Sequence, residues 1–191
     1  MTRITFTAFA MFAFLAGGLA GCQQPKMDLA EMMKPPPRPA ELDQLNMFVG
    51  TWEGTWEMTM MGADKPLTGI GTDTFAWDAE KWVLAEHMDG MMGDSKMVGT
   101  ALWTWDPQHK RFQYYSADCF GMIMTGTAHY DAKTGIWHMK GQTNDTVRGQ
   151  KSNGEGTLKS IDKNTMEMTW SEWDCLHLTK FMEMKGTSHR K

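Results

Sequence analysis

The sequence holds 20 methionines, and the methionine side chain has several possible chemical roles. Several lie two positions apart, so both members of a pair share one face of any β-strand that they occupy. These pairs are Met58 and Met60, Met122 and Met124, Met166 and Met168, and Met182 and Met184. Thioethers bind Cu(I), adapt to varied apolar ligands, or simply fill a core. A copper site needs several sulfurs to converge, and the pairs are scattered along the chain. Core packing is therefore favoured, an apolar pocket comes second, and no metal site is predicted.

Imidazole and several thioethers coincide in one place, residues 87–93, HMDGMMG. Adjacent residues of a strand point to opposite sides, so this segment makes a poor metal site. We interpret it as a mobile loop at a rim of the fold.

Catalytic motifs are missing from the sequence. No serine stands in a Gly-x-Ser-x-Gly turn, and no glycine-rich phosphate loop precedes a helical segment. Glu86 and Asp118 fall on expected strands and could be buried acids, but nothing in the sequence pairs them. Cys119 has no neighbouring cation to activate its thiol. No catalytic residue is predicted, and a protein without enzymatic activity is favoured, with an enzyme kept as an alternative.

The N-terminus has the layout of a bacterial export signal. Arg3 supplies a positive charge, and residues 4–15 form an apolar run too short for a stable membrane anchor. The run ends in Leu-Ala-Gly-Cys22, which resembles the lipobox of bacterial lipoproteins; an ordinary secretory signal is the alternative. The resemblance implies a signal peptide over residues 1–21, lipidation of Cys22 and attachment to the membrane through that lipid. Gln23, in place of the aspartate that retains lipoproteins at the inner membrane, implies the outer membrane facing the periplasm, where the cell has one.

Residues 22–39 contain the proline-rich run KPPPRP and are predicted to be a semi-rigid tether. The formal net charge of −4 comes without a basic stripe, so nucleic acid is not an expected partner. In an oxidising envelope, Cys119 and Cys175 could form a disulfide or lie apart as small buried hydrophobes. The sequence leaves both possibilities open, because it cannot place the two Cα atoms within bridging range.

A short helix is expected over residues 39–49. Pro39 opens it, Leu42, Leu45 and Phe48 recur at three-residue spacing, and Gly50 ends it. Helical periodicity is absent beyond this point.

A repeated turn signature follows, in which a large apolar residue precedes an aspartate and a short polar run. It occurs at Asp78, Asp106, Asp131 and Asp162. Aspartate bonds to the backbone two residues on and so starts a tight turn. The alternating segments between such turns predict about ten strands, near residues 50–61, 67–77, 81–89, 96–105, 111–118, 122–130, 136–143, 154–161, 165–173 and 176–185. With short connections and a need to avoid exposed edges, the expected fold is all-β, an up-and-down antiparallel barrel with a short N-terminal helix.

The first strand shows which side faces inward. Trp52, Gly54, Trp56 and Met58 share one face, and polar residues occupy the other. We predict that this face lines the barrel interior. Gly50 and Trp52 then form the base of the barrel near the helix.

The segment LNMFVGTWEG, together with the Trp-Asp-Pro turn at residues 105–107, is similar to the domain-of-unknown-function family numbered 1579. The Gly-x-Trp start also resembles the calycin superfamily, which includes lipocalins and fatty-acid-binding proteins. The resemblance covers nearly all of the expected barrel domain, residues 40–187. It implies a calycin-like barrel found in secreted proteins and lipoproteins, and it implies no established activity.

The sequence leaves several hypotheses for function. A barrel of about ten strands is wide enough to hold a small apolar or amphipathic ligand, and this hypothesis is favoured. The candidate lining residues are Trp56, Met58, Trp77, Trp103, Tyr114 and Met124. A packed barrel with a structural or interaction role is the main alternative. A haem protein is a weaker one, in which His177 would hold the iron as in nitrobindin-like barrels; no cofactor is predicted.

Overall fold

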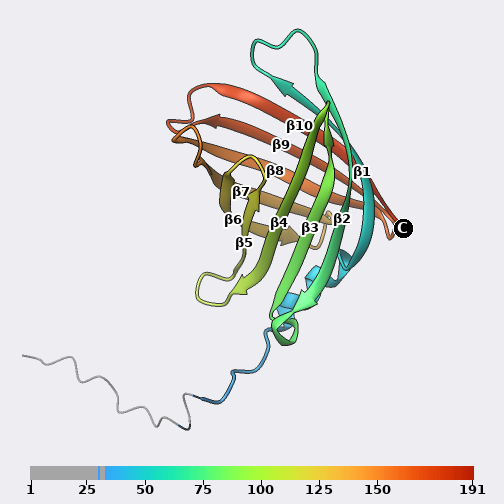
Figure 1. Cartoon of the computed structure of the whole chain (residues 1–191). Coiled ribbons are helices and arrows are strands. Elements are labelled where there is room, and N and C mark those ends of the chain that lie inside the picture. The colour runs from blue at the N-terminus through green and yellow to red at the C-terminus, as the bar shows by residue number, and fades with distance from the viewer. Residues whose placement is uncertain (1–29, 31–32) are drawn as a thin grey trace, which may run out of the picture. The chain divides into compact units, whose positions relative to one another are not determined.

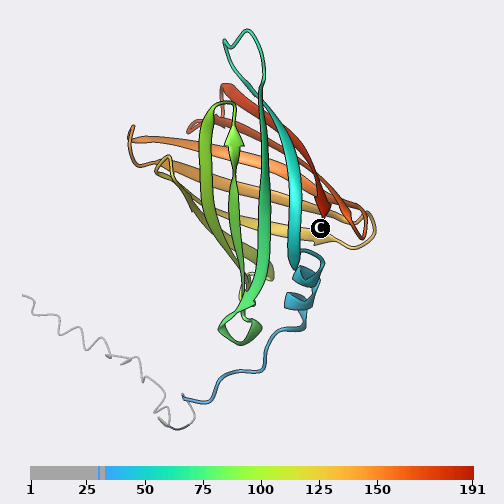
Figure 2. The same ribbon diagram turned by 45° about the vertical axis from the view of Figure 1, so that its right-hand side comes forward.

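The computed structural model describes residue 30 and residues 33–191. Residues 50–190 form a closed antiparallel barrel in which each strand pairs with its chain neighbours and β1 pairs with β10 (Figures 1 and 2). The strands are β1 (Gly50–Met60), β2 (Leu67–Asp78), β3 (Val83–Met92), β4 (Ser95–Asp106), β5 (Arg111–Asp118), β6 (Met122–Asp131), β7 (Ile136–Asp145), β8 (Gln150–Asp162), β9 (Thr165–Asp174) and β10 (Lys180–Arg190). The predicted all-β, up-and-down barrel is confirmed.

Aspartate side chains shape the turns at both ends of the barrel. Asp106, Asp131 and Asp162 each accept a hydrogen bond from the backbone N–H two residues on, at 2.7–3.0 Å, as the turn signature predicts. Asp78 accepts instead from the adjacent Ala79, where the short η2 helix (Ala79–Lys81) begins. The opposite end uses the same device at Asp118, Asp145 and Asp174, which the signature did not single out.

The N-terminal helix is η1 (Ala40–Met47), a 3₁₀-helix. A 3₁₀-helix has three residues per turn, so the three-residue spacing of Leu42, Leu45 and Phe48 gives one continuous apolar edge. All three side chains are buried. Figures 1 and 2 show η1 beside the start of β1, at one end of the barrel, which the helix plugs.

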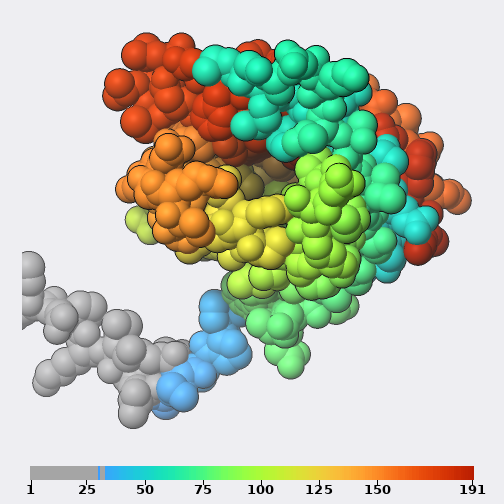
Figure 3. All heavy atoms as spheres, turned by 45° about the horizontal axis from the view of Figure 1, so that its top comes forward, coloured from blue at the N-terminus to red at the C-terminus, as the bar shows by residue number. Residues whose placement is uncertain are grey.

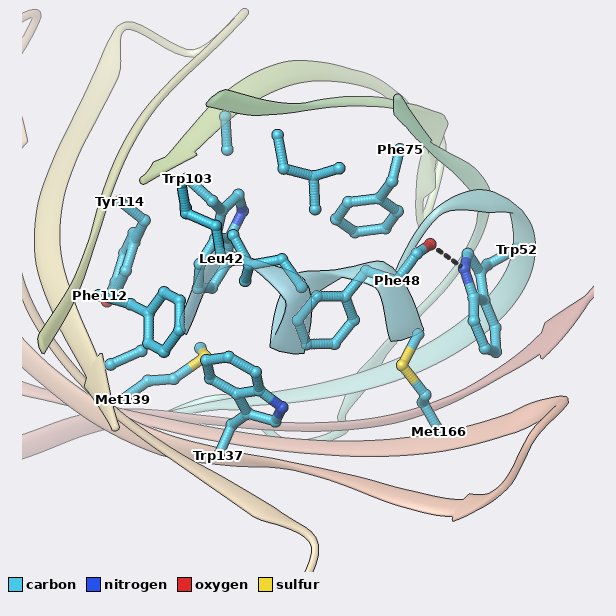
Figure 4. Packing of buried hydrophobic residues seen from close by; sticks show 14 of the residues in the cluster. Leu42, Phe48, Trp52, Phe75, Trp103, Phe112, Tyr114, Trp137, Met139 and Met166 are labelled. Atoms are coloured by element: carbon cyan, nitrogen blue, oxygen red, sulfur yellow. Dashed lines mark hydrogen bonds between the residues drawn. The ribbon is translucent and has the colours of Figure 1, made fainter. Parts of the chain in front are cut away.

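The core gathers around this plug. Phe48 packs against the rings of Phe75, Trp103 and Trp137, with centroids 5.3–6.1 Å apart (Figure 4). Trp52 is 1% exposed, and its Nε1 donates to the carbonyl of Phe48 at 2.7 Å. Trp52 therefore lies at the plugged end of the barrel, where the sequence analysis expects it.

Gly50 has a positive φ of 125°, a conformation that favours glycine. A Cβ atom there would lie 2.8 Å from Nη1 of Arg190, so the small residue also leaves room for that guanidinium. Both properties fit the predicted role of Gly50 at the barrel base.

Several strand ends differ from the expected ranges by a few residues, and two differences in expected boundaries matter most. The last strand runs over Lys180–Arg190, later than the expected 176–185, so the barrel continues beyond the expected limit at residue 187. Residues 175–179 form a turn because the Asp174 carboxylate accepts from the backbone N–H groups of Leu176, Leu178 and Thr179. The alternation of Leu176 and Leu178 thus mimics a strand without forming one.

The other difference is at the tether. Arg38, within the expected 22–39, belongs to the same compact unit as the barrel, residues 38–191. Its Nε donates to the carbonyl of Lys81 at 2.7 Å, and its guanidinium pairs with Asp43. The expected signal peptide and Cys22 lie outside the described residues. In the part of the chain that the structure describes, no helix is long and apolar enough to cross a membrane.

Candidate functional site

A cavity of about 250 Å³ occupies the barrel interior beyond the plug. Phe48 lines it on the side of η1, and Met92, Met97 and Asp118 line it near the turns of the other end. Figure 3 shows the molecule hollowed at that other end, where the β1–β2, β7–β8 and β9–β10 turns lie. We call this end the mouth. The barrel is therefore packed solid at its base and hollow toward its mouth.

Four of the six predicted lining residues do line the cavity, namely Trp56, Trp103, Tyr114 and Met124. Met58 has the right face but is half-buried and lies outside the lining. Trp77 also has the right face, but its Nε1 donates to the side chain of Asn46 at 2.8 Å and Arg38 stacks on its ring. The alternation of a strand gives the face of a residue but not its depth, and at the depth of Trp77 the interior is filled by η1.

Seven methionines line the cavity, although the methionine pairs are scattered along the sequence. The methionines in the lining are Met88, Met92, Met97, Met124, Met139, Met168 and Met184. Closing the barrel brings together single members of several pairs, while their partners fall elsewhere. Met166, for example, packs in the core at the base. The wall is consequently apolar and deformable, because thioether side chains are flexible and polarizable.

The segment at residues 87–93 is mostly strand rather than a loop, because β3 continues to Met92. His87 points outward and is exposed, whereas Met88 and Met92 face the cavity. Among the described residues, no three His, Cys, Asp or Glu side chains are grouped so that they could hold a metal ion.

Three carboxyl groups also line the cavity: Asp73, Glu86 and Asp118. Glu86 Oε2 accepts a hydrogen bond from Nε1 of Trp103 at 3.0 Å. Burial raises the pKa of Glu86 to about 7, with the charge of Asp73 adding to the effect. Burial raises the pKa of Asp73 to about 6. The pKa values of Asp73 and Glu86 are therefore both raised toward neutral pH.

A fourth acid, Glu172, is buried on β9 and is held by three donors. Its oxygens accept from the hydroxyls of Thr143 and Ser152 and from Nε1 of Trp170, at 2.9–3.1 Å. Burial, and then the nearby Glu172 carboxylate, raise the pKa of Tyr114. The Tyr114 hydroxyl is the one buried side-chain oxygen or nitrogen without a hydrogen-bond partner among the described residues.

The sequence did contain a signal for these interior acids. Each acid lies two residues from a buried apolar residue on its own strand. These neighbours are Phe75 for Asp73 on β2, Leu84 for Glu86 on β3, and Trp170 for Glu172 on β9. Each acid therefore stands on the inward face of its strand. Glu86 is one of the two acids that the sequence pattern indicates as candidates for burial, whereas Asp73 and Glu172 are not among the predicted site residues.

The cysteines and His177 lie away from the cavity lining. Cys119 and Cys175 are both free and exposed, so the structure contains no disulfide between them. His177 lies in the β9–β10 turn, where its exposed ring stacks on Trp173 at 4.4 Å. The weaker haem hypothesis required His177 on an inward strand face, and the turn at Asp174 removes it from any strand.

A protein-family model matches residues 39–187 and describes a protein of unknown function, DUF1579. The chain belongs to the DUF1579 family. A comparison with curated proteins gave no match.

Two solved structures share the fold of this DUF1579 chain. Rv2717c from M. tuberculosis is 11% identical with a TM-score of 0.62, and the match covers 81% of this chain and 99% of that one. The S-type phycobiliprotein lyase CPES from Guillardia theta is 8% identical with a TM-score of 0.56, covering 81% of this chain and 94% of that one. At such low identity the likeness shows a shared barrel fold and nothing about ligands.

Proposed function

We propose that the protein is a lipid-anchored binding protein of the cell envelope, which holds a small apolar or amphipathic molecule in its barrel. The observation that carries this proposal is the cavity of about 250 Å³ between the plug and the mouth. Its wall combines aromatic rings with seven methionines, a composition typical of ligand pockets. A barrel with a purely structural role would have no need for an unfilled interior.

The size of the cavity limits the size of the ligand. Small-molecule pockets usually measure about 300–1,000 Å³, so a cavity of about 250 Å³ suits a compact molecule rather than a long-chain lipid. The mouth suits an apolar ligand because its turns carry exposed apolar side chains. These residues are Met61, Phe120, Val147, Leu176 and Leu178.

The anchoring part of the proposal rests on the sequence. The Leu-Ala-Gly-Cys22 boundary and the proline-rich run that follows it support attachment through a lipid on Cys22. Gln23 after the cysteine supports an outer-membrane location facing the periplasm.

A matched pair of variants on β4 tests the binding function. Ala101 lines the cavity, whereas its neighbour Leu102 points outward and is exposed. Ala101→Phe should fill the cavity and abolish the saturable fluorescence rise of a small uncharged naphthylamine dye. Leu102→Phe should leave the dye titration unchanged.

Thermal melts of both variants establish that each remains folded, because overpacking can itself cost stability. Absence of saturable dye binding by the parent protein would favour the packed-barrel alternative. A Soret band on the purified protein would favour the haem alternative.

A further inference from the structure

The charged groups of the cavity are all of one sign. Asp73, Glu86 and Asp118 line it, and no lysine, arginine or histidine is among its described lining residues. Asp118 is committed to its turn, since Oδ1 accepts from the backbone N–H groups of Phe120 and Met122. Asp73 and Glu86 are therefore the acids that remain available inside the barrel.

The two acids are close neighbours on adjacent strands. In the β2–β3 register Asp73 faces Met88 and Phe75 faces Glu86, so Asp73 and Glu86 are diagonal neighbours on the inner face. Among the described residues, the single hydrogen-bond donor to the pair is Nε1 of Trp103, which bonds to Oε2 of Glu86. Oε1 of Glu86 and both oxygens of Asp73 have no hydrogen-bond donor among the described residues. The barrel thus leaves three carboxyl oxygens without a partner at a cavity wall.

Partial burial at the cavity wall disfavours the ionised form of both acids. Removing a carboxylate from water is costly unless a partner charge or donor replaces the water. The pKa of each group rises accordingly, to about 6 for Asp73 and about 7 for Glu86. A positively charged group in the cavity would remove this penalty, because it favours the ionised form of both acids.

The rest of the wall also suits a cation. Trp56, Phe75, Trp103 and Tyr114 line the same cavity, and aromatic faces attract positive charge. The rings are an observation independent of the acids, and both favour the same ligand chemistry. Besides Asp118, other described titratable groups on the inner side of the barrel are Tyr114 on β5, Asp145 on β7, which pairs with Arg148, and Glu172 on β9. Glu172 has three protein donors of its own, so it does not compete for a ligand cation.

We propose that the ligand is a compact apolar molecule bearing a protonated amine, and that the amine binds between Asp73 and Glu86 while the apolar part packs against the aromatic and methionine wall. This inference rests on the proposed function. It adds a ligand class, cationic amphiphiles, and an orientation fixed by β2 and β3.

The test uses three compounds with one apolar skeleton. Naphthalene carrying an ethylamine, a hydroxyethyl or a carboxymethyl side chain presents a cation, a neutral group or an anion of similar size. The full-length protein should bind the amine at least tenfold more tightly than the alcohol at pH 8, and the carboxylate should bind weakest. Displacement of the naphthylamine dye or calorimetry measures all three affinities.

Variants of the pair should remove the selectivity. In Asp73→Asn/Glu86→Gln the preference for the amine should disappear, while the alcohol binds as well as before. Asp89→Asn removes one negative charge from the outer face of β3, where Asp89 pairs with Lys96, and should keep the full preference. Thermal melts show whether the double variant is folded. A pH series on the unmodified protein gives a second measurement, in which the amine preference should shrink between pH 8 and pH 5.5 as protons compete.

The outcomes separate the two proposals. Equal affinity for amine and alcohol in the parent, or an amine preference that survives in the folded double variant, overturns the amine inference and leaves apolar binding intact. Failure of the dye and of all three compounds to bind overturns the proposed function itself.

Discussion

The guanidinium of Arg190 lies over the indole of Trp52, 4.1 Å from the ring centroid, and so joins the last strand to the first at the barrel base. Arg190 also donates to the carbonyls of Met47 and Val49, at the end of η1. One side chain therefore holds the plug, β1 and β10 together. Because Arg190 follows the expected domain limit of residue 187, its importance emerges only from the structure.

Replacing Arg190 with glutamine should lower the free energy of unfolding by about 2–3 kcal/mol, since hydrogen bonds from a charged donor to partly buried carbonyls are lost together with the ring contact. Urea denaturation measures the change. Lys191→Gln is the matched control, because Lys191 is exposed and pairs with Glu53 at the surface. Its effect should stay below about 0.5 kcal/mol. Similarly small effects of Arg190→Gln and Lys191→Gln would show that Arg190 does not hold η1, β1 and β10 together.

Trp52 and Trp56 share the inner face of β1 but differ in depth. Trp52 is enclosed by the core, whereas Trp56 borders the cavity. Trp52→Ala should cost about 3–5 kcal/mol of stability, as expected for emptying a large aromatic site. Trp56→Ala should lower the free energy of unfolding by less, because the Trp56 ring borders the cavity and has fewer packing partners. The substitution should also weaken dye binding or make it less selective. Denaturant melts with dye titrations measure both effects, and equal large losses without dye binding would indicate a packed interior.

The fold was predictable because its signals are local and repeated. Aspartate turns such as Asp106 and Asp131 mark the ends of strands, and alternation on β1 identifies the inward face. Depth was not predictable, because it depends on how far η1 extends into the barrel. Trp77 consequently packs against Asn46 instead of the cavity. The meeting of Asp73 and Glu86 depends on the β2–β3 register, which the sequence pattern does not specify.

The membrane anchor is tested by Cys22→Ser. If Cys22 carries the lipid, the variant should move from the membrane fraction to the soluble fraction, because serine cannot carry the acyl chains that would hold the protein at the membrane. Fractionation with detection of the full chain measures the shift, and Cys119→Ser is the control because that thiol is exposed on the barrel. Retention of Cys22→Ser in the membrane would place the anchor elsewhere.

The tether should be dispensable for folding only up to residue 37. Deleting residues 23–37 should leave the melting transition unchanged, because this segment has no apolar periodicity that would let it contribute to the core. Deleting residue 38 as well should lower stability by about 1 kcal/mol, since Arg38 bonds to Lys81 and Asp43 and stacks on Trp77. Thermal melts of the two truncated forms compare them directly. A large loss on the shorter deletion would contradict the tether interpretation.

Glu86 should make the stability of the unliganded protein depend on pH in a specific direction. Its pKa is about 7 in the folded state against an ordinary value of 4.5, so the folded state binds more protons than the unfolded state between these values. Stability therefore falls as pH rises from about 4.5 to about 7 and remains lower above that range. Glu86→Gln keeps an acceptor for Nε1 of Trp103 and removes the titration.

The variant should consequently match the parent near pH 4.5 and exceed its stability by about 2–3 kcal/mol at pH 8, where the parent must hold a buried charge. Urea denaturation across this pH range measures the difference. Glu57→Gln, on the outer face of β1 beside Lys185, should show no such trend. An amine ligand at saturating concentration should abolish the advantage of Glu86→Gln at pH 8, because it stabilises the ionised pair in the parent. If the advantage of the variant is the same at pH 4.5 and pH 8, Glu86 does not titrate inside the cavity.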